Sequence, residues 1–222
     1  MAIKIENIVP PSISQWMAVI HGLRNPYESW SKMDSTWDLI EDPLPINPDD
    51  TVYIKIGEND LDLMRRLAKA GSDHRKFLRQ LPVIMDVTAP LYFWKEADQY
   101  KVGTVTNSCS TMHTLHKRDL TADDFSCEYC PGVIGGVIET INGWRKRYIE
   151  TNDKKCWYAM IQMLPESFNQ TRTLSCNYEV LWNMWQARKG HRLDEWRLFR
   201  NSIARNVPYF KEIFEFDNDG SV

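Results

Sequence analysis

The stretch LPVIMDVTAPLYFWKEADQYK, residues 81–101, carries the clearest structural pattern in the chain. Its first part, Leu81 to Val87, is rich in β-branched and apolar residues and has a proline only near its start, which is typical of a buried strand. Pro90 then favours the start of a helix, because its fixed φ suits a first helical turn. The stretch therefore predicts a buried strand followed by a helix that reaches about Lys101.

Further regular patterns flank this strand and helix. A second strand is expected over Val102 to Thr106, and glycines at 71 and 190 stand where helices would stop. Elsewhere, apolar residues recurring at helical spacing or a capping residue at the start indicate helices. The expected helices run from Asn59 to Gly71, Val133 to Glu150, Cys156 to Met163, Asn177 to Arg188 and Arg192 to about Glu215. Together these elements predict an α+β fold in which several long helices pack on a small mixed sheet.

The N-terminal region has a different composition. Six of the 11 prolines fall within the first 48 residues, which excludes one long helix there. We expect residues 1–58 to form a proline-rich, irregular segment packed on a domain of residues 59–216. Ser14 to Gly22 and Glu28 to Trp37 are the two places in this segment where a short helix could form.

Composition and charge narrow the class of protein. With 43% hydrophobic and 26% charged residues, the chain is globular rather than disordered. A net charge of -3 argues against the basic surface of a nucleic-acid-coating protein, so we expect no nucleic-acid partner. No apolar run approaches the roughly 20 residues of a membrane span, and the start MAIKIENIVPP lacks an apolar signal stretch. We therefore expect a cytoplasmic location without membrane contact, and the odd count of five cysteines favours reduced thiols.

Three groups of residues follow one another at spacings that a known enzyme family shares. In the first group, Ser72-Asp73-His74 follows the helix that ends at Gly71. In the second, Ala89-Pro90-Leu91-Tyr92-Phe93 leads through Lys95 to Gln99-Tyr100-Lys101, Thr104, Asn107 and Ser110. In the third, Leu164-Pro165 precedes Thr171, Asn177, Arg188, His191 and Glu195. In order and spacing, these groups resemble the flavin-dependent thymidylate synthases over residues 59 to 214.

The chain departs from that family at defined positions. Gln99-Tyr100-Lys101 stands where the family has Arg-His-Arg, so only Lys101 keeps a cation there. Ser108 and Met112 replace a Glu and an Arg of the same motif. The eleven-residue step from Asn177 to Arg188 is retained, and it places both side chains on nearly the same face of one predicted helix.

The resemblance implies a function. The expected reaction transfers a one-carbon unit to C5 of dUMP, with FAD as cofactor and with NADPH and methylenetetrahydrofolate as co-substrates. Arg188 would bind and polarise the nucleotide, because a guanidinium pairs bidentately with phosphate and stabilises developing charge. Ser110 and Thr104 would contribute to substrate binding. The implied flavin contacts are His74, Lys101, Asn107, Asn177 and His191.

The resemblance also implies a homotetramer with ligand sites shared between subunits. Nine Trp, nine Tyr and eight Phe agree with this, since a monomer of this size would have difficulty covering so many aromatic side chains. These side chains should line a core, a pocket or a subunit interface.

Other interpretations remain open at this level. Arg188 could be a cation at a helix end and Asn177 a plain N-cap. The chain could also be a non-catalytic nucleotide-binding or interaction protein that has lost the Arg-His-Arg triplet and with it flavin binding or turnover. A related reaction, such as hydroxymethylation of a pyrimidine nucleotide, is a further alternative. Cys109 could act as a nucleophile, although no adjacent base is evident and a structural thiol is favoured.

A second constellation consists of two histidines and two cysteines. His113, His116, Cys127 and Cys130 have residue types that bind zinc, but one Cys-x2-Cys pair is a weak signal and we expect no metal. A thioredoxin-like role is favoured even less, because no βαβ pattern flanks Cys127.

Overall fold

The computed structural model describes residues 3–37 and 54–216 and contains one four-stranded sheet in the order β1-β2-β4-β3. The strands are β1 (Lys4–Val9), β2 (Pro82–Pro90), β3 (Val105–Ser108) and β4 (Asn169–Asn177). Their three pairings are all antiparallel. The α+β fold expected from the sequence is thus confirmed, with a sheet that is antiparallel rather than mixed.

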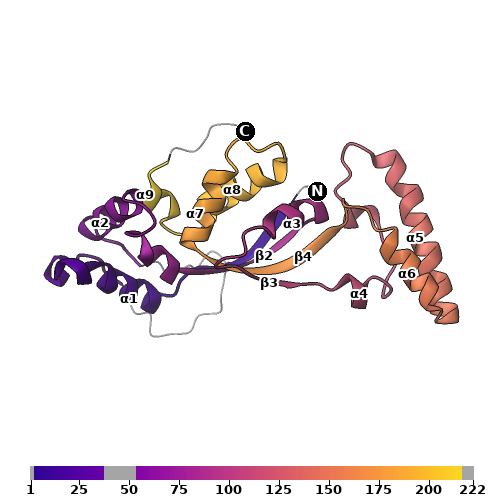
Figure 1. Ribbon diagram of the computed structural model, residues 1–222, viewed down its shortest axis with the longest axis horizontal. Helices are drawn as coiled ribbons and strands as arrows, with labels where there is room; N and C mark the ends of the chain where they lie inside the picture. The colour runs from indigo at the N-terminus through magenta and orange to yellow at the C-terminus, as the bar shows by residue number, and fades with distance from the viewer. Residues whose placement is uncertain (1–2, 38–53, 217–222) are drawn as a thin grey trace.

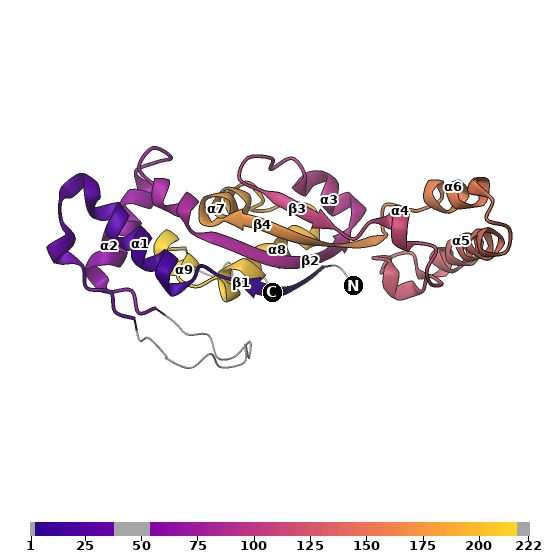
Figure 2. The same cartoon turned by 90° about the horizontal axis from the view of Figure 1, so that it is seen from below.

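Nine described helices accompany the sheet. They are α1 (Ile13–Arg24), α2 (Glu58–Lys69), α3 (Leu91–Ala97), α4 (Thr111–Thr114), α5 (Pro131–Thr151), α6 (Lys154–Gln162), α7 (Tyr178–Ala187), α8 (Asp194–Asn206) and α9 (Phe210–Phe214). Helices α1 and α2 lie at one end of the elongated molecule, whereas α5 and α6 lie beyond the opposite end of the sheet (Figures 1 and 2). Among the described residues, no helix combines the length and apolarity needed to cross a membrane.

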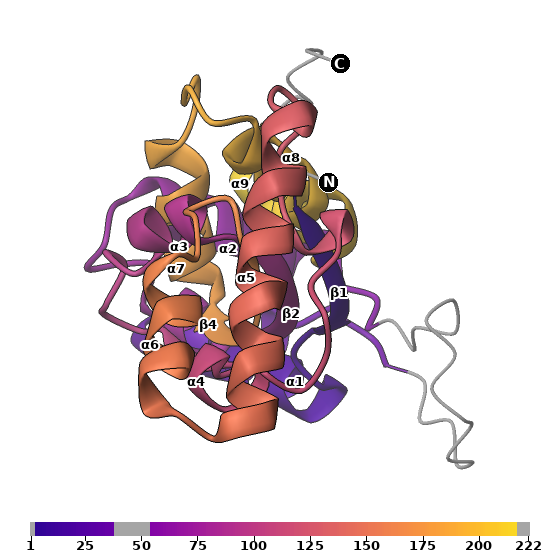
Figure 3. The ribbon, with the colours of Figure 1, turned by 90° about the vertical axis from the view of Figure 1, so that its right-hand side faces the viewer.

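Two separate apolar cores follow from this shape. The main core joins one face of the sheet to α1, α2, α3, α7, α8 and α9. The smaller core holds together residues 111–162, which we call the arm, and includes Leu115, Phe125, Ile134, Ile141 and Met160. Figure 3 views the molecule from the arm's end, with α5 in front and α6 beside it.

The central strands β2 and β4 pair along their whole length, from Pro82 opposite Asn177 to Pro90 opposite Asn169. Alternate residues of β2 point to opposite faces, as in any strand. Val83, Met85 and Val87 are fully buried in the main core, while Asp86 between them lies on the open face. The strand expected over 81–87 is confirmed, and it continues past the apolar residues to Pro90.

Several helix predictions are confirmed by the structure. Helix α2 ends just before Gly71, which has a φ of +103° that favours glycine. Helices α5, α6 and α7 match the segments expected to be helical.

Two other boundaries differ from expectation. Helix α3 ends at Ala97 rather than near Lys101, because the chain turns at once with Tyr100 N–H donating to Ala97 and Lys101 N–H to Gln99. As a result, strand β3 begins at Val105, three residues later than predicted. The expected last helix is divided into α8 and α9, since Pro208 lies between them and cannot donate a helical hydrogen bond.

The N-terminal segment contributes regular structure to the main fold. Strand β1, absent from the sequence-based prediction, pairs with β2, and helix α1 occupies the place of the first short helix expected. Glu28 to Trp37 holds a single 3-10 turn, Trp30–Lys32, rather than a helix. Trp16 and Ile20 are buried in the main core. A domain boundary at residue 58 stays a prediction, and residues 38–53 of this segment lie outside the described part.

A buried ion pair ties α1 to α2. Arg24 Nε and Nη2 lie 2.7 and 2.6 Å from Asp60 Oδ1, and both side chains are almost fully buried. The other oxygen of Asp60 accepts hydrogen bonds from the backbone and hydroxyl of Ser35. Because both charges are paired inside the protein, removing either one leaves the other uncompensated.

We expect Asp60→Asn to lower the free energy of unfolding by about 3–5 kcal/mol, measured by urea denaturation, because Arg24 would stay buried without its counter-charge. Asp62→Asn is the matched control on the same helix. Asp62 is exposed and pairs with Arg66 one turn later, so its loss should cost no more than about 0.5 kcal/mol. Equal losses in the two variants would contradict a special role for the buried pair.

The same measurement at low pH provides a second control. Burial raises the pKa of Asp60, but hydrogen bonds from Ser35 and Arg24 outweigh it and hold the pKa below 3.8. Since the folded pKa lies below the unfolded one, this contribution is complete above the unfolded pKa and is lost as the pH falls through the folded pKa. The difference between the wild type and Asp60→Asn should therefore shrink below about pH 4.

Candidate functional site

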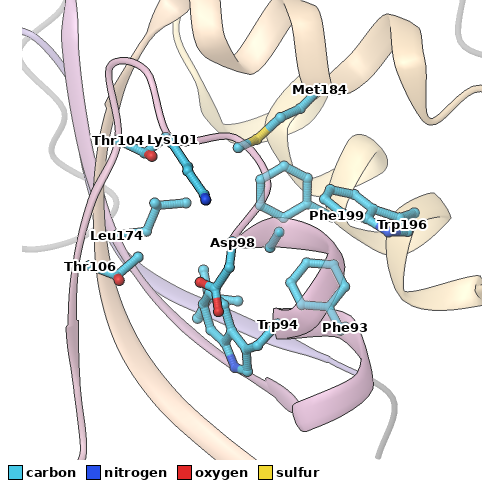
Figure 4. Close-up of a pocket in the computed structure, with 12 residues that line it drawn as sticks. Phe93, Trp94, Asp98, Lys101, Thr104, Thr106, Leu174, Met184, Trp196 and Phe199 are labelled. Carbon is cyan, nitrogen blue, oxygen red and sulfur yellow. The ribbon is translucent and has the colours of Figure 1, made fainter.

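A cavity of about 220 Å³ lies between α3, the loop that follows it, the sheet, and helices α7 and α8 (Figure 4). Its lining consists of Val87, Phe93, Trp94, Ala97, Asp98, Lys101, Thr104, Thr106, Leu174, Met184, Trp196 and Phe199. The lining brings together residues that are about one hundred positions apart in the sequence.

Aromatic rings form much of the cavity wall. Phe93 of α3 and Trp196 of α8 lie with ring centroids 4.6 Å apart, and Phe199 is 5.7 Å from Trp196. Trp94 donates its indole N–H to the carbonyl of Gln170, which fixes its ring beside β4. Flat apolar walls of this kind suit the faces of a planar ligand. The sequence-based expectation that tryptophans line a core or a pocket is confirmed here.

Of the two charged residues that line the cavity, Asp98 has an ion-pair partner and Lys101 has none among the described residues. The carboxylate of Asp98 lies 2.7 Å from Arg172 Nη1, and the Arg172 guanidinium stacks over Trp94 at 4.3 Å. Lys101, whose amino group points into the cavity in Figure 4, makes no ion pair with any described residue. The unpaired cation gives the cavity an electrostatic preference for an anionic group.

The loop that carries Lys101 and Thr104 is held against the start of α7. Gly103 has a φ of +78°, and a Cβ there would lie 3.0 Å from Val180 Cγ2 and 3.2 Å from Asn177 Nδ2. Both the conformation and the close approach favour glycine. Thr104 Oγ1 donates a hydrogen bond to the carbonyl of Tyr100, which closes the loop on itself.

Arg188 does not line the cavity itself but stacks on Trp196, which does, and it is bound within the protein. Its Nη1 donates to Glu96 Oε2 at 3.0 Å and its Nε to the Tyr100 hydroxyl at 3.0 Å. Its guanidinium stacks over Trp196 at 4.6 Å, and 15% of the side chain is exposed. A guanidinium has five N–H donors, so three remain without a partner among the described residues.

His191 shares the same carboxylate. Its Nε2 lies 3.1 Å from Glu96 Oε2, and its Nδ1 accepts the backbone N–H of Leu193 at 3.1 Å. An Nδ1 that accepts a hydrogen bond carries no proton, so the neutral ring has its proton on Nε2 and donates it to Glu96. The indole N–H of Trp196 also donates to this oxygen, at 2.9 Å. Glu96 thus links α3 to α8 and to the loop between α7 and α8.

Asn177 caps α7 as the sequence indicated. Its Oδ1 accepts the backbone N–H of Val180 at 3.0 Å, which satisfies one of the free donors at the helix start. Its side-chain nitrogen faces the Gly103 loop. The capping role is therefore present, and a ligand contact stays a prediction.

The remaining candidates lie elsewhere. His74 is exposed in the turn after α2. Asn107 follows Thr106 in β3, so it points to the opposite face of the sheet from the cavity. Ser110 precedes α4, between two residues that line a second cavity of about 240 Å³. The eight candidates thus lie in four regions of one chain, with five of them in or beside the first cavity.

Sequence reasoning missed several residues that build this site. Glu96, Asp98, Arg172 and Trp196 were not among the site residues expected from the sequence. Crowded aromatic residues just before Glu96 and Asp98, and a tryptophan five positions after His191, were the available signals. These sequence signals point to a site only when the fold is known, because β4 places Arg172 beside α3.

The alternative thiol and zinc sites are also placed by the structure. No group of three or more metal-ligating side chains comes together in residues 3–37 and 54–216, so His113, His116, Cys127 and Cys130 do not form one site there. The sulfur of exposed Cys109 lies 3.8 Å from the Thr114 hydroxyl, which is not a base that would activate a thiol.

Comparison with known proteins identifies the fold. No family model matches the chain, and no curated protein matches its sequence. Two crystal structures of the flavin-dependent thymidylate synthase X from Helicobacter pylori with FAD and dUMP superpose with TM-scores of 0.69 and 0.68 at 14% identity, covering 96% of this chain and 97% of theirs. A UMP/dUMP methylase from Streptomyces cacaoi bound with 5-Br dUMP gives a TM-score of 0.62 at 15% identity, over 96% and 94% of the two chains. The chain has the fold of the flavin-dependent thymidylate synthases.

Proposed function

We propose that this protein transfers a one-carbon unit to C5 of a deoxyuridine nucleotide, with dUMP as substrate, and that it works in the cytoplasm. The cavity carries the proposal, because it combines flat aromatic walls with one unpaired cation, Lys101. A pyrimidine nucleotide offers a planar ring and a phosphate, which are the two groups that such a cavity favours. The similarity in fold to enzymes crystallised with dUMP supports the same assignment.

Arg188 and Lys101 have distinct roles in this proposal. Lys101 attracts the nucleotide phosphate as a point charge. Arg188 is held in place by Glu96, Tyr100 and Trp196, so its three remaining donors are pre-oriented for the charge that develops on the base. Ser110 and Thr104 complete the proposed nucleotide contacts.

FAD is the proposed cofactor, with NADPH and methylenetetrahydrofolate as co-substrates. When bound, a flavin supplies hydride transfer. Residues of one chain do not surround such a group: Asn107, His74 and His191 lie in different regions, and the cavities beside Lys101 and Ser110 measure only about 220 and 240 Å³. Ligand pockets usually reach about 300–1,000 Å³. We therefore derive no step through the flavin and propose a site completed by other copies of the chain.

A homotetramer is the assembly that we propose for this purpose. The arm leaves large apolar side chains uncovered, among them Tyr129, Val133 and Ile149, whose exposures are 95%, 71% and 59%. Exposed apolar groups on an extended element favour burial against another chain.

A second function is favoured by one specific observation. Arg188 is already paired with Glu96 through a 3.0 Å hydrogen bond, so the chain supplies this guanidinium with a counter-charge without any ligand. With the Arg-His-Arg triplet also replaced, the alternative is a non-catalytic nucleotide-binding or interaction protein on the same fold. A related reaction, such as hydroxymethylation of a pyrimidine nucleotide, would use the same cavity.

Nucleotide binding tests the role of Lys101. In calorimetric titrations with dUMP, Lys101→Gln should raise the dissociation constant about ten- to a hundred-fold, because a charge-assisted contact contributes about 1.5–3 kcal/mol. Lys95→Gln is the matched control, since Lys95 is an exposed lysine that pairs with Glu166 away from the cavity. Equal affinity in the wild type and Lys101→Gln would remove Lys101 from the nucleotide site.

Arg188 requires a test that separates ligand contact from packing. Arg188→Ala should also weaken dUMP binding about ten- to a hundred-fold, and Arg188→Lys should recover part of it. Glu96→Gln keeps Arg188 and removes its counter-charge, so the guanidinium becomes more available and dUMP affinity should be retained or increased.

A purely structural role predicts a different pattern for these variants. Arg188→Ala and Glu96→Gln would then weaken binding together and lose folded signal by circular dichroism. Wild-type affinity in folded Arg188→Ala would exclude Arg188 from the site.

The assembly can be measured independently of catalysis. Light scattering at micromolar concentration should give a particle of about four times the 26.1 kDa chain mass. Val133→Lys, on the exposed side of α5, should shift this particle toward smaller species by placing a charge in an apolar contact. A stable wild-type monomer would contradict the shared-site proposal.

A further inference from the structure

Cys127 and Cys130 lie where the chain enters α5. Cys130 directly precedes Pro131, the first residue of the helix. The backbone N–H of Cys130 donates to the carbonyl oxygen of Cys127 at 3.2 Å, which closes a four-residue turn. Such a turn keeps its end Cα atoms within about 7 Å, and a disulfide spans about 4.4–6.8 Å between Cα atoms. The backbone therefore holds both residues within reach of a disulfide.

The side chains of these two cysteines are neighbours and can be reached by solvent. Cys130 is exposed and Cys127 is half-buried. The thiol of Cys127 donates to Ser167 Oγ at 3.1 Å. The neighbouring Cys127 thiol raises the pKa of Cys130. The two cysteines are thus neighbours on one turn of the reduced protein.

The other three cysteines lack this combination. Cys156 and Cys176 are buried, and burial raises the pKa of Cys176 to about 12. Cys109 is exposed, but its polar neighbour is the hydroxyl of Thr114. Among the described cysteines, only Cys127 and Cys130 are both accessible to solvent and next to another thiol. Neither takes part in the proposed nucleotide chemistry.

We propose that Cys127 and Cys130 form a redox-active dithiol that reacts with low-molecular-weight disulfides to give an intrachain disulfide. One cysteine loses its proton and attacks a sulfur of the small disulfide, which releases one small thiol and leaves a mixed disulfide. The second cysteine then loses its proton and attacks the protein sulfur of that mixed disulfide, which releases a second small thiol. Two protein thiols are oxidised, one small disulfide is reduced, and the protons leave on the two thiols released.

Oxidation would act at the junction of the arm with the sheet. The disulfide removes the thiol proton that Cys127 donates to Ser167, while the neighbouring backbone bond from Ser126 N–H to the Ser167 carbonyl, 2.8 Å long, stays in place. The turn can therefore change its oxidation state without separating the two segments that it joins.

The test uses the full-length reduced protein and oxidised glutathione, followed by acid quenching and peptide mass mapping. The peptide that contains Cys127 and Cys130 should lose two hydrogens and carry no glutathione, whereas Cys109 should gain one glutathione. Excess reduced glutathione should reverse both changes. Cys127→Ser and Cys130→Ser, each confirmed as folded by circular dichroism, should instead carry glutathione on the remaining thiol of the turn.

Two results would overturn the proposal. The first is a wild-type protein in which Cys127 and Cys130 stay reduced, or carry glutathione without forming the internal bond, while Cys109 reacts. The second comes from repeating the reaction in urea: an equal rate of internal disulfide formation in the unfolded chain would show that the folded turn contributes nothing. A faster reaction in the native protein is the expected outcome.

Discussion

The antiparallel pairing of β2 with β4 determines where the candidate binding residues lie. At one end of the pair, Tyr178 N–H donates to the Leu81 carbonyl, so α7 begins beside the start of β2. At the other end, Leu91 N–H donates to the Phe168 carbonyl, so α3 begins beside the start of β4. The two strands therefore deliver α3 and α7 to the same buried face, and the cavity forms between these helices and α8.

Glu96 completes this arrangement by joining elements that the sheet only brings near one another. Its Oε2 accepts hydrogen bonds from Arg188 and Trp196 and lies 3.1 Å from His191 Nε2. The carboxylate offsets the charge of Arg188, and the neighbouring rings of Tyr100 and Trp196 hold the guanidinium in one orientation. Because the guanidinium is already held in one orientation, it loses little conformational entropy when it binds a ligand. Glu96, however, neutralises part of the charge that would attract that ligand.

The sequence was informative where one physical signal dominated. The apolar run at 81–87 predicted β2, and the capping side chain of Asn177 predicted the start of α7. Both predictions succeeded because an apolar run and a capping residue are local features of the sequence. Strand β4 was missed because NQTRTLSCN buries only Leu174 and Cys176, so its pattern is mostly polar. Its identity as a strand depends on partners nearly ninety positions away. The pairing of Arg188 with Glu96 depends on the same long-range register, so helix spacing could identify Arg188 but not its partner.

Turnover is the most direct test of the proposed reaction. Purified protein would be incubated with FAD, NADPH, methylenetetrahydrofolate and each deoxypyrimidine monophosphate in turn, and the nucleotide products would be identified by mass. A product that carries one added methyl group from dUMP alone is the predicted result. No change in the mass of any nucleotide, from a folded protein that binds dUMP, would contradict an enzymatic role and leave nucleotide binding as the function of this fold.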